Sequence, residues 1–554
     1  MGNAVVYDRA EVQRRIHLKL FPQESQKVLM TPVETTLAKL SASSIRVQLA
    51  DGTLGVSLER LVEIYFGQLQ KYGNSNFALT DIFYEKALQR AAQFTATVRD
   101  FSTSSEFDKY PLLGFVMSLK DSIKYQNSDS TLGFTKNIGR PYTETPKFIK
   151  YLEYQGAIIL CKGNVPQALM PLECDNVCFG ATSNPFDDTR TSGGSSGGDT
   201  VLVATQCVNA ALGTDIAGSL RAPALFCGVY AFKPTAGRLP LDAEAGPFDQ
   251  LDVYGKTGDR QTLIKSTIGP IAKSVEDIIT LSRVMVNYNV YDPRVPLIPW
   301  KDVPAPKRVG LVKGFEVIME NSMTAERALT EASEALQRNG FEIVNINIRD
   351  HVEKIVLYAY AIFFKDQGLM NIIDNKVGFA EALSPSFENI KRLMEYPLSE
   401  LKQHIKTMNS RERIMMDAYI TAHEYNVGYL MDMQMHYSQL LIDSFMSAGV
   451  EVAIAPGIFP AIKKFTSQFC NLMTAFLIVW NFANFPAGAV PITRVKAEEE
   501  NYVTTFEDSI TNSFRSNLHG STGLPVGVQV VGLPWRDELV VAVMRSLEQA
   551  IGFK

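Results

Sequence analysis

The chain contains 554 residues, 46% of them apolar, and carries a formal net charge of −5 at neutral pH. That length allows a substantial buried core, and the lack of a basic excess argues against a nucleic-acid partner. The six cysteines and six histidines are scattered without the spacing of metal ligands. We therefore expect no metal site and interpret the cysteines as buried free thiols in a reducing compartment.

The amino-terminal part, residues 1–75, is predicted to be mainly helical, and residues 58–66 show the clearest helical spacing of apolar positions. We expect this part to form a helical extension that packs on a catalytic domain spanning residues 76–554. The first nine residues show neither a signal peptide nor a spanning helix. Gly2 fits an N-myristoylation site, but Val6 stands where serine or threonine is expected. The chain is therefore expected in the cytoplasm.

Residues 114–123 alternate well enough to form a strand, and Lys120 lies in it among largely uncharged neighbours. Consecutive side chains of a strand face opposite ways, so Asp121 need not pair with Lys120 or hold its proton in place. Burial without a carboxylate lowers the pKa of a lysine, which can then serve as a neutral base. The alternative interpretation is a surface lysine whose amine reaches water.

Two serine-bearing loops follow, at residues 192–198 and 213–221, and no histidine lies in or between them. A serine hydroxyl is a poor nucleophile until a base removes its proton, and histidine is the usual base. The two loops therefore indicate serine hydrolysis with another base, for which Lys120 is the natural candidate.

The first loop has two competing interpretations. Residues 193–197 match the Gly-x-Ser-x-Gly nucleophile elbow with Ser195 as the nucleophile, but that motif requires a strand directly before it. Residues 184–191 are instead polar and turn-rich. Residues 193–200 also approach a phosphate-binding loop, but Asp199 occupies the position of its lysine and would repel phosphate. Neither alternative is favoured.

Beyond the loops, segments with helical periodicity alternate with short β-rich runs, which predicts an α/β architecture. The proline-rich residues 292–306 are interpreted as a connection within one domain. The longest apolar stretch, residues 472–491, contains Asn481, Asn484 and Pro486 and is therefore not expected to span a membrane. The clearest expected strands are residues 157–161, 308–312, 342–346, 450–455 and 527–531.

Residues 387–408 carry apolar positions at helical spacing, and Pro397 is expected to divide them into two helices. Such a pair of helices could lie on a bilayer surface. Glu388, Glu395 and Glu400 reduce its apolar character, so packing on the core of the domain is favoured over membrane contact. The apolar positions are Phe387, Ile390, Leu393, Met394, Leu398, Leu401, Ile405 and Met408.

Several of these features belong to motifs at definite spacings. The motifs comprise Ser118-Leu119-Lys120, residues 164–167, the two serine loops, residues 226–228 and 233–235, and a carboxyl-terminal run at residues 523–535. Together they resemble the amidase signature family of Ser-Ser-Lys hydrolases, most closely its fatty acid amide hydrolase branch. The likeness extends from about residue 75 to the end of the chain, and the apolar residues 472–491 resemble a buried segment of the family.

The resemblance implies a single α/β catalytic domain with a central mixed, twisted β-sheet covered by helices on both faces. It also implies that Ser219 is the acylated nucleophile, Lys120 the ultimate base and Ser195 the relay between them, with a cis peptide bond between Gly194 and Ser195. The chain departs from the family at Ala217, where glycine is common, and the added methyl restricts positive φ. The implied oxyanion hole comprises the backbone amides of Ile216, Ala217, Gly218 and Ser219.

Ser196, Asp215 and Arg221 are expected to support the site structurally, the last two as a buried pair beneath the nucleophile loop rather than as catalytic groups. The resemblance implies hydrolysis of fatty acid amides, such as acylethanolamides and primary fatty amides, to a fatty acid and an amine without metal or cofactor. The apolar residues expected to bind the acyl chain are Leu169, Met170, Leu172 and Trp535, the last aligning with a tryptophan near the family's acyl channel.

Three other functions compete with this one. Within the fold, the chain could be a general small-amide amidase or the amidase subunit of a glutamine-dependent tRNA amidotransferase. Such a subunit would need polar residues that bind a charged amino acid, and it would also need partner subunits. A non-catalytic binding protein is disfavoured because Lys120, Ser195 and Ser219 are all retained. We expect a lipid amide as ligand, no nucleic-acid partner, at most peripheral contact with a membrane, and a homodimer.

Overall fold

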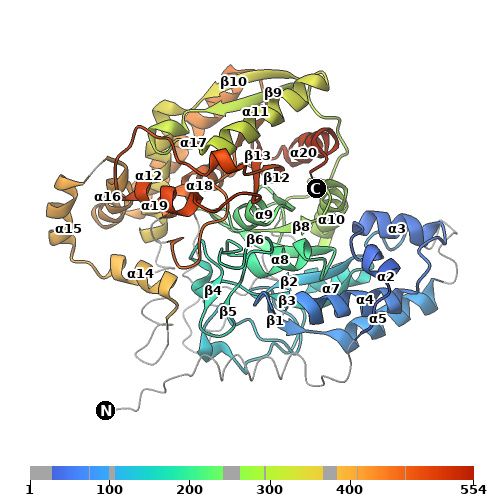
Figure 1. The fold of residues 1–554 in the computed structure, drawn as a ribbon. Coiled ribbons are helices and arrows are strands. Elements are labelled where there is room, and N and C mark those ends of the chain that lie inside the picture. Colours follow the sequence, from blue (N-terminus) through green and yellow to red (C-terminus); the bar gives the residue numbers. More distant parts are fainter. Residues whose placement is uncertain are drawn as a thin grey trace, which may run out of the picture.

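A computed structural model describes residues 28–73, 75–98, 107–240, 263–291, 295–365, 383–408, 410–467 and 470–553. The predictions for the first nine residues, including Gly2 and Val6, lie outside the described residues. Figure 1 shows a central sheet surrounded by helices, which confirms the predicted α/β fold.

One large sheet forms the framework of the described chain. Its strands are β1 (Leu79–Ile82), β2 (Val116–Lys120), β3 (Ile158–Gly163), β6 (Ala210–Asp215), β7 (Tyr230–Lys233), β8 (Thr267–Ala272), β9 (Arg308–Lys313), β10 (Glu342–Asn347), β11 (Val452–Pro456), β12 (Ala487–Arg494) and β13 (Pro525–Gly532). They lie in the order β1-β3-β2-β6-β8-β7-β12-β13-β11-β9-β10. The sheet is mixed: β2 pairs in parallel with β3 and β6, whereas β6 pairs antiparallel with β8. A separate two-stranded ribbon joins β4 (Asp175–Asn176) to β5 (Gly180–Ala181).

The strands predicted from β-rich runs are confirmed. Five of them correspond to β3, β9, β10, β11 and β13, and the strand predicted to contain Lys120 is β2. The central strands are buried along their whole length, as β6 and β13 show. β10 lies at one edge of the sheet and leaves several side chains exposed. The core of the protein therefore lies over the middle strands.

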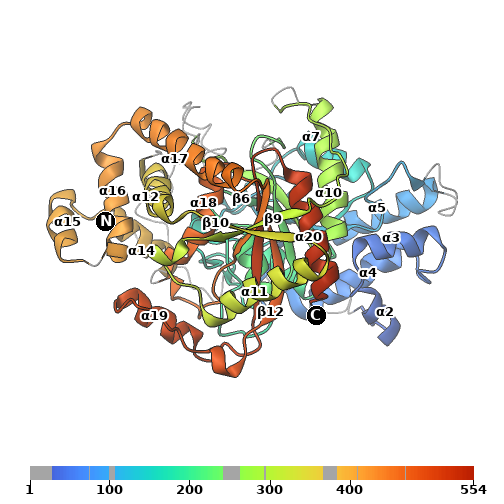
Figure 2. The same cartoon turned by 90° about the horizontal axis from the view of Figure 1, so that it is seen from above.

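Helices cover both faces of the sheet, as the resemblance implied. α8 (Gly197–Ala204) and α9 (Arg221–Cys227) pack together on one face. α10 (Val275–Asn287), α11 (Met323–Arg338) and α20 (Asp537–Ile551) pack on the other, where Figure 2 shows α11 beside α20. Gly488 of β12 lies against Met544 of α20, whereas Gly527 on the adjacent strand β13 lies against Leu225 of α9.

The amino-terminal helices form a group at one side of the sheet (Figure 1). They are α2 (Pro32–Leu37), α3 (Ala42–Ala50), α4 (Leu58–Gln68) and α5 (Tyr84–Thr97), and a π-helical turn follows α4 at Leu69–Gly73. The predicted helix at residues 58–66 is α4. Ser57 begins it by accepting a hydrogen bond from the Arg60 amide, which satisfies one unpaired amide of the first turn. The boundary between residues 75 and 76 stays a prediction.

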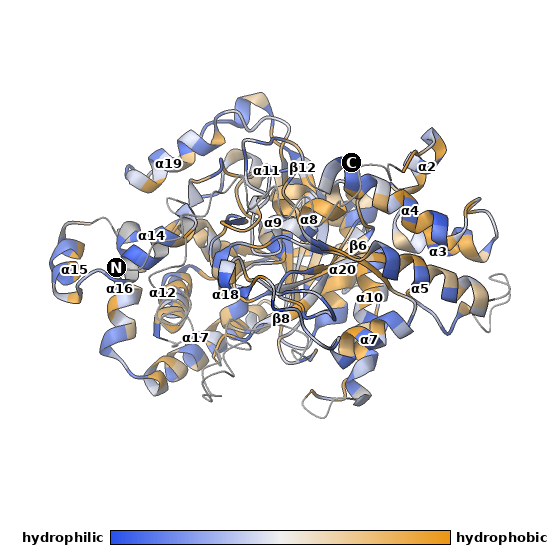
Figure 3. Ribbon diagram, turned by 90° about the horizontal axis from the view of Figure 1, so that it is seen from below, coloured by the Kyte–Doolittle hydropathy of each residue, from blue (hydrophilic) through white to orange (hydrophobic). Residues whose placement is uncertain are grey.

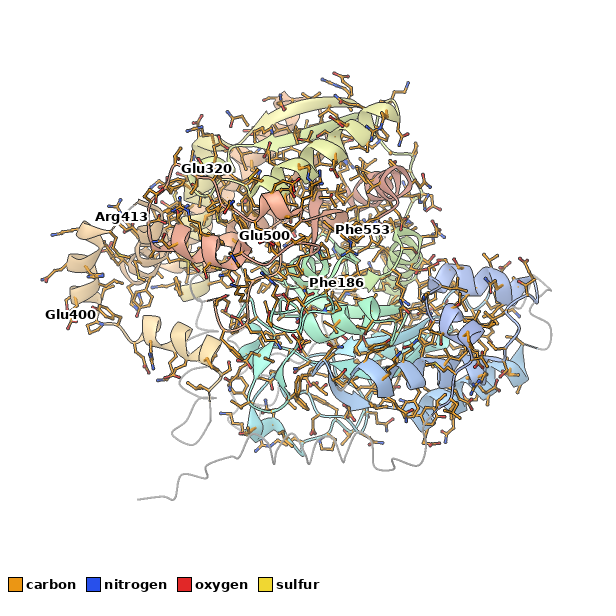
Figure 4. The ribbon with its side chains drawn as sticks, in the orientation of Figure 1. Phe186, Glu320, Glu400, Arg413, Glu500 and Phe553 are labelled. Atoms are coloured by element: carbon orange, nitrogen blue, oxygen red, sulfur yellow. The ribbon has the colours of Figure 1, made fainter. Side chains whose placement is uncertain are left out.

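The opposite side of the molecule carries α12 (Arg349–Lys365), α14 (Pro385–Met394), α15 (Leu398–His404), α16 (Ser410–Glu424) and α17 (Val427–Ser447) (Figures 1 and 2). Pro397 immediately precedes α15, so the predicted division of residues 387–408 is confirmed. Phe387 and Leu401 are buried, and the Phe387 ring lies 6.2 Å from the Phe134 ring. Figure 4 shows Glu400 and Arg413 on the outer side. Phe387 and Leu401 therefore pack on the domain, and contact of residues 387–408 with a membrane stays a prediction.

The remaining described helices are α7 (Lys147–Tyr154), α18 (Ala475–Phe482) and α19 (Ser509–Leu518). Every residue of α18 is buried, so the longest apolar stretch of the chain lies inside the protein. Figure 3 shows both hydrophilic and hydrophobic residues on outer helices such as α5 and α19. Within the described residues, no helix combines the length and apolarity needed to cross a bilayer. All six cysteines are buried and unbridged, as predicted.

Candidate active site

Two neighbouring parallel strands bring the predicted base and the nucleophile loop together. β2 ends at Lys120, and β6 ends at Asp215, four residues before Ser219. The register pairs Leu119 with Leu212, so the carboxyl ends of both strands lie at the same edge of the sheet. Residues that are far apart in the sequence therefore meet at this edge.

Lys120 is fully buried there. Its Nζ atom donates hydrogen bonds to Ser195 Oγ at 2.7 Å and to Thr214 Oγ1 at 2.8 Å, and it reaches the Thr214 carbonyl oxygen at 3.3 Å. A base must lie within hydrogen-bond reach of the hydroxyl whose proton it takes. The lysine meets that requirement toward Ser195, and the alternative of a surface lysine is excluded by its burial.

Asp121, the next residue, has other partners. Its Oδ2 atom accepts hydrogen bonds from the Leu132 amide at 2.8 Å and from the Thr131 hydroxyl at 3.2 Å. Burial raises the pKa of this carboxyl, and the nearby charge of Lys162 partly offsets that rise. As strand alternation predicted, Asp121 faces a different set of groups from Lys120.

The loop around Ser195 links the lysine to the nucleophile loop. The peptide bond between Gly194 and Ser195 is cis, as predicted. Ser195 is buried, and the backbone amide of Ser196 donates to the Ser219 carbonyl oxygen at 3.0 Å. Ser219 itself is only half-buried. Lys120 and Ser195 are thus enclosed, while Ser219 remains accessible from outside.

The nucleophile-elbow interpretation of Ser195 lacks its strand. Residues 184–191 form turns, with isolated bridges at Thr191 and Arg190 and no strand among the described residues of this segment. Since the elbow requires a strand that runs directly into the nucleophile, the geometry disfavours Ser195 in that role.

The predicted oxyanion hole differs from expectation at one amide. The Gly218 amide donates to Asp215 Oδ1 at 2.8 Å, so it is already engaged. The amides of Ile216, Ala217 and Ser219 have no acceptor among the described residues. Three free backbone amides so close together beside a serine can stabilise a developing oxyanion. These three amides, without Gly218, are the donors that the structure leaves available.

Ala217, where the family commonly has glycine, does not require a glycine conformation here. It is not among the described residues with positive φ, whereas Gly218 has a φ of +118°. A Cβ atom on Gly218 would lie 2.4 Å from a methyl carbon of Leu477 in α18. Glycine is therefore needed at 218, and the methyl of Ala217 adds no backbone strain.

Asp215 and Arg221 form a fully buried ion pair below the nucleophile loop. Arg221 Nε donates to Asp215 Oδ2 at 3.0 Å, and Asn481 Nδ2 donates to Asp215 Oδ1 at 2.9 Å. Burial alone would raise the pKa of Asp215, but the charge and hydrogen bonds of Arg221 hold that pKa well below its usual range. Arg221 Nη1 also donates to Gln529 Oε1 at 2.7 Å. Because Asp215 also binds the Gly218 amide, this network fixes the path of the loop that carries Ser219.

Leu172, Leu169 and Met170 lie in the segment that follows β3. A Cβ atom on Gly194 would lie 3.2 Å from the Leu172 carbonyl oxygen, so this segment packs against the loop of Ser195. Leu172 is 6% exposed, and the other two are half-buried. The structure thus brings the backbone of this apolar segment next to the loop that carries Ser195.

Trp535 lies at the same edge of the sheet but farther along it. It follows β13, its backbone amide donates to Thr235 Oγ1 at 3.0 Å, and it is 39% exposed. Thr235 follows β7, which is three strands from β2 in the sheet. At about 4.8 Å per strand, that corresponds to roughly 14 Å. The structure therefore places the Trp535 backbone near the end of β7, and its role in binding substrate stays a prediction.

Three residues that support the site were not predicted from the sequence in that role. They are Thr214, which binds Lys120, Gln529, which binds Arg221, and Asn481, which binds Asp215. Asn481 gave a signal, because a polar residue in a buried apolar stretch needs a hydrogen-bond partner. Thr214 lies within the serine-loop motif, but only the register of β2 and β6 shows that it meets Lys120. No group of His, Cys, Asp and Glu within the described residues could hold a metal ion.

Comparisons with known proteins show what the whole chain is similar to. A family model described as Amidase matches residues 60–541, which is most of the chain. Fatty-acid amide hydrolase 1 of Sus scrofa is 28% identical over 451 residues, covering 79% of this chain and 76% of that protein. A glutamyl-tRNA(Gln) amidotransferase subunit of Protochlamydia amoebophila is 26% identical over 541 residues, covering 93% of this chain and 97% of that protein.

Among solved structures, one of a fatty acid amide hydrolase superimposes with a TM-score of 0.76 at 20% sequence identity. The superposition covers 99% of this chain and 91% of that one. A likeness at this identity shows a shared fold, including the large mixed sheet flanked by helices.

Proposed function

The chain belongs to the amidase family, and from this premise we propose that it hydrolyses fatty acid amides through an acyl-enzyme on Ser219. The observation that supports the proposal most directly is the 2.7 Å hydrogen bond between Lys120 Nζ and Ser195 Oγ, which couples a buried amine to the loop that contacts Ser219. A hydroxyl nucleophile without a histidine needs such a base.

The proposed reaction begins with attack of Ser219 Oγ on the amide carbonyl carbon. Ser195 Oγ takes the proton of Ser219 and passes its own proton to neutral Lys120. The negative charge on the carbonyl oxygen is stabilised by the amides of Ile216, Ala217 and Ser219. The proton then returns from Lys120 through Ser195 to the nitrogen, so that the amine leaves and an ester to Ser219 remains. Water, activated by the same two groups, hydrolyses this ester and releases the carboxylic acid.

The proposal of an apolar acyl group is supported by the apolar residues near the Ser195 loop. Leu169, Met170 and Leu172 offer carbon surface, and Leu172 belongs to the segment that packs against the Ser195 loop. The similarity to fatty acid amide hydrolases points to the same substrate class. The similarity to an amidotransferase subunit makes glutamine the main competing amide donor.

A series of amides that differ only in acyl length tests this substrate class. Each buried methylene contributes about 0.8 kcal/mol, so four further carbons in the pocket should raise kcat/KM by a factor on the order of 10². Measurements below micelle-forming concentrations should show a steep rise toward long chains and no hydrolysis of free glutamine. A flat profile, or a maximum at short chains, would instead identify a general small-amide hydrolase.

We further propose that the protein is a homodimer whose contact with membranes is at most peripheral. The inward packing of Phe387 and Leu401 supports weak membrane contact, because it removes two apolar side chains from the surface. Light scattering of the purified protein would give the oligomeric state, and flotation with anionic and neutral vesicles would measure attachment.

A further inference from the structure

Asp199 is a buried carboxylic acid that the reaction as proposed does not use. It lies in the first turn of α8 and is fully buried. Its Oδ1 atom accepts a 2.7 Å hydrogen bond from Ser118 Oγ, and its Oδ2 atom has no hydrogen-bond partner within the described residues. A Cβ atom on Gly163 of β3 would lie 2.4 Å from Asp199 Cγ, so only a glycine leaves room for the carboxyl here.

The carboxyl lies on the same side of β2 as the proposed base. Ser118 and Lys120 are two residues apart on this strand, and side chains at that spacing share a face of the sheet. Ser118 binds Asp199, and Lys120 binds Ser195, so the two hydrogen bonds run side by side from one strand. The charge of Lys120 favours the ionised form of Asp199 and so lowers its pKa.

Burial raises the pKa of Asp199 to about 7, and the Ser118 hydrogen bond and the charge of Lys120 limit that rise. The carboxyl can therefore exist in either charge state at neutral pH. The other titratable or charged groups around it are Asp121, which directly follows β2, Cys161 and Lys162 of β3, and Cys174. Asp215 of β6 and Arg221 of α9 pair with each other.

Resting on the proposed function, we propose that Asp199 is a positioning residue that controls whether Lys120 carries a proton in the resting enzyme. An ionised carboxylate stabilises the ammonium form of the lysine, which cannot accept a proton. When one proton moves from Lys120 Nζ to the carboxyl, the lone pair stays on nitrogen and both groups become neutral. The pair then keeps its total charge, while the lysine becomes a competent base.

The pH profile of kcat/KM tests this role, with Asp199→Asn as the variant. Without the carboxylate, Lys120 should lose its proton more easily. The acid limb of the kcat/KM profile should therefore move to lower pH by about one unit, and it should follow a single ionisation. The matched control is Asp277→Asn. Asp277 is a buried carboxyl in the first turn of α10, on the opposite face of the sheet from α8, and it binds the Ser43 hydroxyl at 2.5 Å. Its variant should keep the wild-type profile.

Ser118→Ala provides a second measurement if Asp199→Asn does not fold. Loss of the hydroxyl removes a hydrogen bond that favours the ionised carboxyl, so the acid limb should move in the same direction by a smaller amount. Folding of each variant is checked by circular dichroism. Acid limbs that coincide with wild type in folded variants would overturn the proposal and leave Asp199 with a structural role. Absence of amide hydrolysis by the wild-type protein would instead overturn the proposed function.

Discussion

Lys120 Nζ donates a 2.7 Å hydrogen bond to Ser195 Oγ, although the two residues lie on different elements and 75 positions apart in the sequence. The contact exists because β2 delivers the lysine to the edge of the sheet where the serine loops meet. A second bond, to Thr214 Oγ1, fixes the direction of the amine.

Lys120→Ala should reduce kcat/KM by roughly 10² to 10⁴ near neutral pH, because it removes the general base. Part of the activity should return at high pH, where hydroxide can take the proton. The matched control is Lys273→Met, which removes a half-buried lysine that binds the Ala38 carbonyl oxygen at 2.6 Å. Near-wild-type activity of Lys120→Ala at pH 7 would show that the proton path ends elsewhere, with Lys124 the next residue to test.

Thr214→Val should lower kcat about tenfold with little change in KM, because it removes one hydrogen bond to the base while keeping the shape of the side chain. Thr267→Val is the control. Thr267 faces Asp215 in the neighbouring strand, and its hydroxyl donates to the Ile268 carbonyl oxygen at 3.2 Å. Steady-state kinetics on one amide would compare the two variants, and equal losses in both would contradict a specific role for Thr214.

Arg221→Met should destabilise the protein by about 3 to 5 kcal/mol near neutral pH, because Asp215 would stay buried without its partner. The pKa of Asp215 is lowered in the folded state. The pair therefore stabilises the fold above the unfolded pKa of about 3.9, and this contribution is lost as the pH falls through the folded pKa. The difference between wild type and variant should shrink on acidification.

Urea unfolding at several pH values measures this difference. Arg308→Met is the control, because Arg308 pairs with Glu342 on the surface at 3.1 Å, and exposed pairs are worth about 1 kcal/mol or less. A loss in Arg221→Met no larger than that in Arg308→Met would contradict the structural role of the buried pair.

Leu172→Ser should lower kcat/KM for a long-chain amide about tenfold or more, with little effect on a short-chain amide, because it removes apolar surface beside the serine loop. Trp535→Ala tests the contribution of Trp535 to the predicted acyl pocket separately from that of Leu172. A loss of kcat/KM in Trp535→Ala that is confined to long-chain amides would show that the acyl site extends along the sheet edge to Trp535. Equal effects of Leu172→Ser on amides of all chain lengths would show that Leu172 is not part of the acyl site.

Local patterns predicted the elements that position the site. The alternation in residues 114–123 predicted the strand with Lys120, and Pro397 predicted the break before α15. The motif spacings predicted the residues that meet at the sheet edge. These predictions succeeded because each depends on neighbours in the sequence or on a motif that the family shares.

Contacts between distant segments could not be predicted in the same way. The sequence does not show that the Gly218 amide binds Asp215, because that bond depends on how the loop turns over the buried ion pair. The partners of Asp199 and Thr214 depend on the register of β2 against β3 and β6. The place of Trp535 along the sheet edge depends on the strand order, which separates β13 from β2 by several strands.

The most direct test is the site of covalent labelling by a fluorophosphonate, read by mass spectrometry of the intact and digested protein. The adduct should lie on Ser219 alone, and Ser219→Ala should abolish both labelling and amide turnover, with a loss on the order of 10⁶ in rate. Its fold should stay intact, since the Ser219 side chain is only half-buried and the change removes a single oxygen atom. An adduct on Ser195 or Ser196, or turnover that survives in Ser219→Ala, would contradict the account.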